Sequence, residues 1–299
     1  MAVDPEACGP ISPHMAMYIK CVQELQHDSQ KPRYVHIYGK HFPTRVAATP
    51  DFVFVVPAFD ASVGNRMVHE GVPMPQEMSL CRHLVPSGGI VIDVSARAGG
   101  FTVPIAAHVG ESGRVYAFEP LRALFQILSA NVAMNGLSNV YTFQARLSNE
   151  TKTVEERNPD FKTIAHRSQM HSVDNVAAQM AILYGESEDI HVRLLDAYAH
   201  RQQRVDLIRI GIEYLALPIL QGSARSLAKH RPLVFIEGSE AESTANLHDR
   251  ADVVAFLSTL QYVCRGFEQS LLLDMTSVLC SPVEQSGILS TLDRFFLGF

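Results

Sequence analysis

The sequence lacks the features of a membrane-spanning, zinc-binding or nucleic-acid-binding protein. No apolar run reaches the roughly 18 residues that a membrane-spanning helix needs, although 47% of the 299 residues are hydrophobic. The five cysteines are an odd number without CxxC spacing, so we expect reduced thiols rather than a zinc site or a disulfide framework. A formal net charge of −6 provides no basic surface for a nucleic-acid backbone, so no nucleic-acid partner is expected.

The N-terminus also lacks a secretory signal, because residues 1–6 carry acid where such a signal carries base. We therefore predict a cytoplasmic protein with no membrane attachment. The length suits one large α/β domain, predicted over residues 77–299, preceded by an N-terminal region over residues 1–76. An amphipathic helix from Tyr18 to Leu25 is expected to pack on the body or, alternatively, to contact a second copy or a partner protein.

Two buried strands, each ending in a carboxylate, are the most informative part of the sequence. Residues 90–92 are apolar, and Asp93 follows them before a turn of small residues that runs to Gly100. A second apolar run, residues 115–118, ends in Glu119, about 20 residues beyond Gly99. In a doubly wound sheet this spacing places a carboxylate where it can bind ribose hydroxyls, so the pattern predicts a nucleotide-like ligand.

Strands and helices alternate through the rest of the chain, which predicts a mainly parallel sheet with helices on both faces. The expected central strands cover residues 90–94, 114–118, 140–144, 205–210 and 233–237. The expected helices cover residues 76–84, 101–108, 121–135, 218–229 and 249–260. A small N-terminal sheet is expected within residues 34–57, and a closing antiparallel hairpin within residues 261–299.

Residues 150–190 interrupt this alternation and are expected to form a functional or mobile insert without regular structure. His166, His171 and His191 lie in or beside it. A histidine there would be able to take a proton from an attacking hydroxyl, although solvated loop histidines are commoner. No histidine or carboxylate set has the spacing of a metal site, so no metal is expected.

With these motifs placed, the chain resembles the FkbM family of class I S-adenosylmethionine-dependent methyltransferases. Five ordered blocks carry the resemblance, at residues 91–102, 113–120, 131–140, 205–214 and 230–237. The resemblance implies a Rossmann-like, doubly wound sheet of seven strands in the order 3-2-1-4-5-7-6, with the seventh strand antiparallel. It also implies a methyl donor, S-adenosylmethionine, over the carboxyl ends of the first strands, and O-methylation of a small metabolite, sugar or natural-product intermediate.

The resemblance assigns roles to individual residues. The turn from Asp93 to Gly99 would wrap the methionine part of the donor, and Glu119 would accept hydrogen bonds from both ribose hydroxyls. Thr102 would cap the helix that follows the turn. The full set of donor-binding candidates is Asp93, Ser95, Ala96, Gly99, Thr102, Glu119, Asn131, Ala145 and Gly211, with Asn131 and Ala145 on the adenosine side.

Glu213, at the end of the fourth strand, is the acid/base candidate, and Glu237, which ends the next strand, is the reserve candidate. Ser95 stands where the family usually has Gly, and Arg97 where it usually has Asn. Gly211 and Tyr214 occupy the first and last positions of the family pattern Asp-Val-Glu-Gly, so one carboxylate is missing. A Cβ at Ser95 would be strained if the turn needs a positive φ.

Three readings remain open: an altered but active enzyme, a binding or scaffold subunit that no longer catalyses, and a chain that binds nothing. A dinucleotide-dependent oxidoreductase is a further alternative, because a strand, a glycine turn and a distant acid describe its site too. Arg97 in the middle of the turn argues against pyrophosphate binding there. Since methyl transfer needs alignment more than covalent help from the protein, we favour an active methyltransferase.

Overall fold

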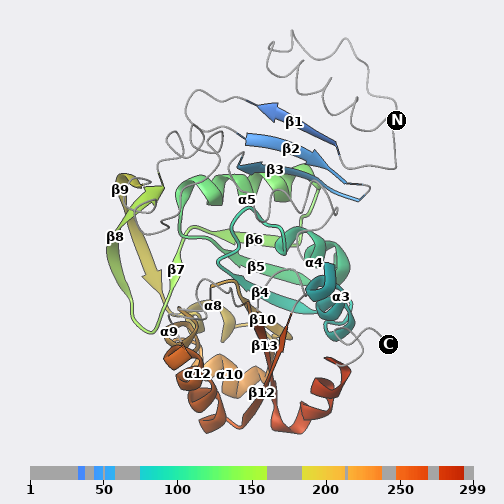
Figure 1. The fold of residues 1–299 in the computed structure, drawn as a ribbon, viewed down its shortest axis with the longest axis vertical. Coiled ribbons are helices and arrows are strands. Elements are labelled where there is room, and N and C mark those ends of the chain that lie inside the picture. The colour runs from blue at the N-terminus through green and yellow to red at the C-terminus, as the bar shows by residue number, and fades with distance from the viewer. Residues whose placement is uncertain are drawn as a thin grey trace.

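The computed structural model describes residues 33–37, 44–49, 51–57, 75–159, 184–212, 215–237, 247–268 and 276–292. Two bodies of β-structure stand out: a seven-stranded central sheet and a small N-terminal sheet that lies above helix α5 (Arg122–Met134) in Figure 1. The expected helix from Tyr18 to Leu25 lies outside the described residues. The boundary at residue 76 stays a prediction.

The N-terminal sheet is a three-stranded antiparallel meander, as expected from residues 34–57. Its strands are β1 (Arg33–Ile37), β2 (Thr44–Ala48) and β3 (Val53–Pro57), in that order. Phe54 and Val56 of β3 are fully buried and pack against Val103 of α4 (Thr102–Val109). The sheet is therefore fixed to the main body through one of its strands.

The central sheet confirms the predicted seven-stranded topology. Its order is β12-β13-β11-β10-β4-β5-β6, which in chain order reads 6-7-5-4-1-2-3. All neighbours pair in parallel except β13, which is antiparallel to both β11 and β12. The strands are β4 (Ile90–Val94), β5 (Arg114–Phe118), β6 (Val140–Phe143), β10 (Leu207–Ile210), β11 (Leu233–Ile236), β12 (Tyr262–Glu268) and β13 (Thr276–Pro282).

Alternation along the strands separates two hydrophobic layers. Residues at odd positions, such as Val91, Leu207 and Phe235, pack with α3 (Pro75–Leu84) and α4. Residues at even positions, such as Ile92 and Ile208, pack on the opposite face with the helices that follow β10 and β11. Those helices are α9 (Ala216–Gln221), α10 (Ala224–His230) and α12 (Leu247–Thr259), and α8 (Asp196–Ala199) precedes β10.

Two expectations about the fold are wrong. Residues 150–190 are not irregular throughout, because β8 (Lys152–Pro159) and β9 (Tyr184–Arg193) form a long antiparallel hairpin, which β7 (Arg146–Leu147) extends into a third sheet. The single helix expected over residues 218–229 is two helices, α9 and α10, separated at Gly222 and Ser223. The closing hairpin expected within residues 261–299 is confirmed, because β12 and β13 pair in antiparallel orientation.

Cys264 and Cys280 form a disulfide across the β12–β13 ladder, where they are direct partners. The expectation of only reduced thiols is therefore wrong for this pair. Cys81 is a free, buried thiol whose pKa is raised by burial. The chain ends, within the described residues, in the 3-10 helix η3 (Val283–Thr291), which packs beside β13.

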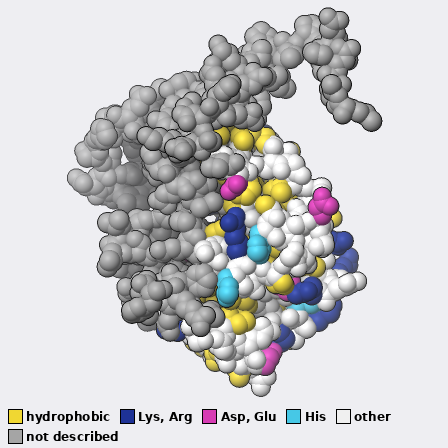
Figure 2. All heavy atoms as spheres, turned by 90° about the vertical axis from the view of Figure 1, so that its right-hand side faces the viewer, with side chains coloured by type: hydrophobic (Ala, Val, Ile, Leu, Met, Phe, Trp, Pro, Cys, Tyr) yellow, Lys and Arg dark blue, Asp and Glu magenta, His cyan; other side chains and the backbone are white. Residues whose placement is uncertain are grey.

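The described helices include none that is both long and apolar enough to cross a bilayer. Figure 2 shows the face on the right-hand side of Figure 1, where basic, acidic and histidine side chains are interspersed with uncharged surface in the described part of the chain.

Candidate functional site

The turn between β4 and α4 has an unusual backbone. Ser95 and Arg97 adopt positive φ angles of 61° and 53°, a region that favours glycine, and Gly99 follows at 84°. A Cβ at Gly99 would lie 2.8 Å from Leu128 Cδ1 on α5, so the turn also approaches that helix closely. Ser95 therefore has the positive φ at which a residue with a Cβ is strained. Arg97, the second non-glycine residue of the turn with a positive φ, is strained in the same way.

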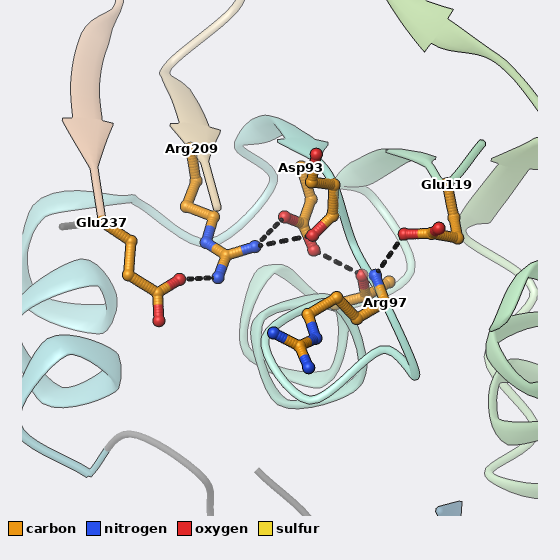
Figure 3. A network of polar contacts seen from close by, with 7 residues as sticks. Asp93, Arg97, Glu119, Arg209 and Glu237 are labelled. Carbon is orange, nitrogen blue, oxygen red and sulfur yellow. Dashed lines mark hydrogen bonds and ion pairs between the residues drawn. The ribbon is translucent and has the colours of Figure 1, made fainter. Parts of the chain in front are cut away.

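Glu119, directly after β5, holds this turn from one side (Figure 3). Its Oε2 accepts the backbone N–H of Arg97 at 2.8 Å, and its Oε1 accepts that of Leu121 at 3.0 Å. The residue is only 3% exposed. Burial raises the pKa of Glu119 from its usual 4.5 to about 7, although the N–H donors of Leu121 and Arg97 lower it. Each oxygen accepts one of these hydrogen bonds and keeps a second lone pair.

On the other side of the turn, the guanidinium of Arg209 pairs with two carboxylates, one from each of the strands that flank its own strand (Figure 3). Arg209 of β10 donates from Nη1 to Asp93 Oδ1 at 2.8 Å and pairs through Nη2 with Glu237, which directly follows β11. Register explains the meeting, because Arg209 is the ladder partner of Asp93 in parallel strands and shares its face. We call Asp93, Arg209 and Glu237 the ion-pair cluster.

The ion-pair cluster is almost fully shielded from solvent. The side chains of Asp93, Arg209 and Glu237 are 0%, 6% and 14% exposed. Burial raises the pKa of Asp93, and Arg209 and Thr102 oppose that rise. Burial alone would lower the pKa of Arg209, but Glu237 and Asp93 together raise it, so the guanidinium stays charged. Arg209 also lies 5.3 Å from the centre of the Phe101 ring.

Asn131, in the last turn of α5, holds the 95–99 turn from a third direction. Its Nδ2 donates to Ala98 O at 2.7 Å and to Val55 O at 2.8 Å, and its Oδ1 accepts the N–H of Val55 at 2.6 Å. One turn further on, Asn135 makes the same pair of bonds to the backbone of Val53. The two amides therefore bind the edge of β3 as a neighbouring strand would, and Asn131 links that edge to the turn.

The predicted donor residues differ in what they contact. Thr102 is the first residue of α4 and does not cap it; its Oγ1 donates to Asp93 Oδ2 at 2.6 Å, so the expected capping role is wrong. Ala96 and Ala145 are buried, and Gly211 donates its N–H to Val94 O at 2.9 Å. Direct donor contacts by these residues stay predictions.

The acid/base candidates are only partly described. Glu213 and Tyr214 lie outside the described residues, as do His166 and His171. His191 lies exposed on β9, with Nδ1 3.4 Å from Thr153 Oγ1 of the neighbouring strand. Within the residues that the structure describes, no group of three His, Cys, Asp or Glu is arranged to hold a metal.

Sequence reasoning missed Arg209 as a site residue. The sequence pattern indicates only that Arg209 belongs to a core strand, yet a cation in a four-residue strand whose other members are apolar needs a buried anion as partner. Asp93 and Glu237, at the ends of the two strands beside β10, were the available carboxylates. That combination was a usable signal.

Solved structures that are similar to this chain have low sequence identity to it. The methyltransferase FkbM from Methylobacillus flagellatus KT is 17% identical, with a TM-score of 0.43; the match covers 64% of this chain and 43% of that one. TYW2 of M. jannaschii, solved with AdoMet, is 14% identical with a TM-score of 0.45, covering 82% of this chain and 86% of that one. TomG, an O-methyltransferase from Streptomyces achromogenes, is 10% identical with a TM-score of 0.43, covering 70% and 80%.

Among curated proteins, none matches this chain. The match to this chain spans less than half of the Methylobacillus flagellatus protein, 43% of its length. The family model of the methyltransferase FkbM domain, however, matches residues 93–264, more than half of the sequence. The match begins at Asp93 and runs through the turn, Glu119, Arg209 and Glu237 to Cys264 in β12. This chain therefore belongs to the FkbM family of S-adenosylmethionine-dependent methyltransferases.

Proposed function

We propose that the chain binds S-adenosylmethionine against the 95–99 turn and transfers its methyl group to a hydroxyl of a small metabolite, sugar or natural-product intermediate. The observation that carries the proposal is Glu119. It ends the strand next to the turn, is oriented by two backbone N–H groups, and keeps a free lone pair on each oxygen. A carboxylate so placed is suited to two adjacent ribose hydroxyls.

The small residues of the 95–99 turn suit the methionine part of the donor, which the family resemblance assigns to this turn. Gly99 lets the backbone approach α5 more closely than a residue with a Cβ would, and Ala96 adds little bulk. The donor supplies an electrophilic methyl group, and the sulfonium loses its charge as that group leaves. The protein's part is to orient the donor, to exclude water and to receive the proton of the acceptor hydroxyl.

For the proton, Glu213 remains the proposed base, and Glu237 the reserve. Glu237 is held by Arg209 through one oxygen, Oε2, and is the most exposed member of the ion-pair cluster. A small-molecule acceptor is in keeping with a chain whose formal net charge is −6. A homo-oligomer or protein partner through the N-terminal helix is also part of the proposal.

The test is calorimetric titration of the protein with S-adenosylmethionine, S-adenosylhomocysteine and NAD at pH 8, where Glu119 is ionised. We expect both adenosyl ligands to bind, and Glu119→Ala to weaken them by about 1.5 to 3 kcal/mol, as expected for lost bonds to a charged group. Glu111→Ala removes an exposed carboxylate outside the site and should change nothing. Tight binding of NAD alone would replace the proposal with the oxidoreductase.

A second candidate is a subunit that binds the donor without catalysing. The observation that favours it is the ion-pair cluster, whose charged groups are directed at one another rather than outward. Turnover distinguishes the two candidates. If the wild-type protein binds S-adenosylmethionine but releases no S-adenosylhomocysteine with a broad panel of hydroxyl acceptors, it is a binding subunit.

A further inference from the structure

Arg209 occupies space that a side chain at position 211 would need. A Cβ built on Gly211 would lie 2.4 Å from Arg209 Nη1, 2.7 Å from Cζ and 2.9 Å from Nη2. Real Cβ atoms do not approach heavy atoms this closely, so the guanidinium would have to move. The family pattern has Asp at this position. In this chain Gly211 has no side chain, and the guanidinium of Arg209 occupies the space that such a side chain would need.

The guanidinium has little freedom to move. Its Nη1 is bonded to Asp93 and lies 3.4 Å from Ser95 O, and its Nη2 is paired with Glu237. Its Nε has no hydrogen-bond partner among the described residues, so no polar group on that side would hold the guanidinium in a second position. Displacing the group would leave buried carboxylates unpaired, which is costly in a dry site.

Ser95 O connects this arrangement to the turn. Ser95 begins the turn at a positive φ, and the carbonyl facing Arg209 belongs to that strained residue. The turn is thus held by Glu119, by Asn131 and, at its first residue, by Arg209. Strained backbone persists where surrounding contacts over-determine it.

We infer that Arg209 and Gly211 are a coupled pair: Arg209 is a positioning residue for the donor turn, and Gly211 is required because the guanidinium fills the space above it. This inference rests on the proposed function in taking the turn as the donor site. It identifies a residue that touches no reacting atom but fixes the backbone that would surround the donor.

The test is a double-mutant cycle of Gly211→Ala and Arg209→Lys, read by thermal unfolding and by titration with S-adenosylhomocysteine. A lysine ammonium has no planar fork above position 211 and can still pair with Asp93. We expect Gly211→Ala to weaken binding by about tenfold and to lower the unfolding temperature in the wild-type background. In the Arg209→Lys background the same change should have little effect on either, so Lys rescues it.

Gly287→Ala is the control, because a Cβ there meets nothing within 4 Å; it should be neutral in both backgrounds. Equal effects of Gly211→Ala on unfolding in the two backgrounds would overturn the coupling. Coupling in the unfolding temperature with unchanged affinity, at a temperature where circular dichroism shows all variants folded, would overturn the positioning role. Failure of the wild type to bind the ligand overturns the proposed function instead, while the unfolding cycle still decides the coupling.

Discussion

The two sides of the 95–99 turn treat charge differently. On the β5 side, Glu119 accepts hydrogen bonds from two backbone N–H groups, and burial raises its pKa to about 7 because these bonds and the charge of Arg97 lower it by less. On the β10 side, Asp93 and Glu237 share one buried guanidinium. The first side keeps acceptor capacity for a ligand, and the second uses its charges to fix the protein itself. Of the altered family positions, Gly211 lies on the β10 side beside Arg209, whereas Arg97 lies on the β5 side with its N–H bonded to Glu119.

Removing the guanidinium should have the largest effect on this comparison. We expect Arg209→Met to lower the free energy of unfolding by about 3 to 5 kcal/mol, because it leaves Asp93 and Glu237 buried without a counter-charge. Urea unfolding followed by circular dichroism measures the change. Arg204→Met is the matched control, since Arg204 is 56% exposed in its ion pair with Asp206 and should contribute about 0 to 1 kcal/mol. Equal costs at the two positions would show that the ion-pair cluster does not stabilise the fold.

Titrating Glu119 tests the other side of the turn. Its pKa is about 7 in the folded protein against a usual 4.5, so its contribution to stability is fully present below pH 4.5 and is lost as the pH rises through 7. The difference corresponds to about 3 kcal/mol. We expect Glu119→Gln to flatten this part of the stability profile between pH 5 and 8 in urea unfolding. Gln also turns an N–H₂ group toward a backbone donor, a cost that should not vary with pH.

An unchanged slope in the Glu119→Gln variant would assign the pH dependence to other groups. With a ligand present the sign reverses: hydroxyl donors favour the carboxylate, so affinity for S-adenosylhomocysteine should rise with pH through about 7 in the wild type only. Calorimetry at pH 6 and 8 measures that difference.

The sequence predicted the central sheet well because its strands are short apolar runs with sharp ends. Residues 90–94 and 114–118 match β4 and β5 in full, and the family resemblance supplied the strand order. The sequence did not predict the β8–β9 hairpin because its strands are polar. The two strands are also far apart in the sequence, and the local pattern does not encode their register. The disulfide escaped for the same reason, since Cys264 and Cys280 meet only through the β12–β13 register.

Within the site, the sequence predicted that Glu119 ends its strand, as the structure confirms, and it named the positive φ that would strain Ser95. The ribose-binding role of Glu119 stays a prediction. The sequence did not predict that Asn131 would be fully buried with its amide bound to Val55 and Ala98. That contact depends on how the N-terminal sheet docks on α5, which no motif in residues 34–57 specifies. The position of a residue at a strand end can therefore be predicted from the sequence, whereas a contact that depends on how two elements dock cannot.

Asn131 tests whether the N-terminal sheet supports the β5 side of the turn. Asn131→Ala leaves Val55 and Ala98 with unpaired backbone groups, so we expect a loss of about 2 kcal/mol in the free energy of unfolding. Asn149→Ala removes an exposed amide that is bonded to the side chains of Gln221 and Ser148, and it should change stability by less than about 0.5 kcal/mol. Hydrogen exchange should increase at both the 95–99 turn and β3 in the Asn131 variant. An increase at β3 alone would show that the turn is held without it.

The smallest expected effect concerns Ser95, where the two sides of the turn meet. Its φ of 61° is strained for serine and free of strain for glycine, so Ser95→Gly should stabilise the protein by about 0.5 to 1 kcal/mol after the added unfolded-state entropy of glycine is counted. Ser87→Gly is the control, because Ser87 is exposed and not at positive φ; it should be neutral or slightly destabilising. Differential scanning calorimetry separates the two. If Ser95→Gly instead destabilises, its side chain must make a contact that outweighs the strain, and Ser95 would be a selected member of the site rather than a tolerated departure from glycine.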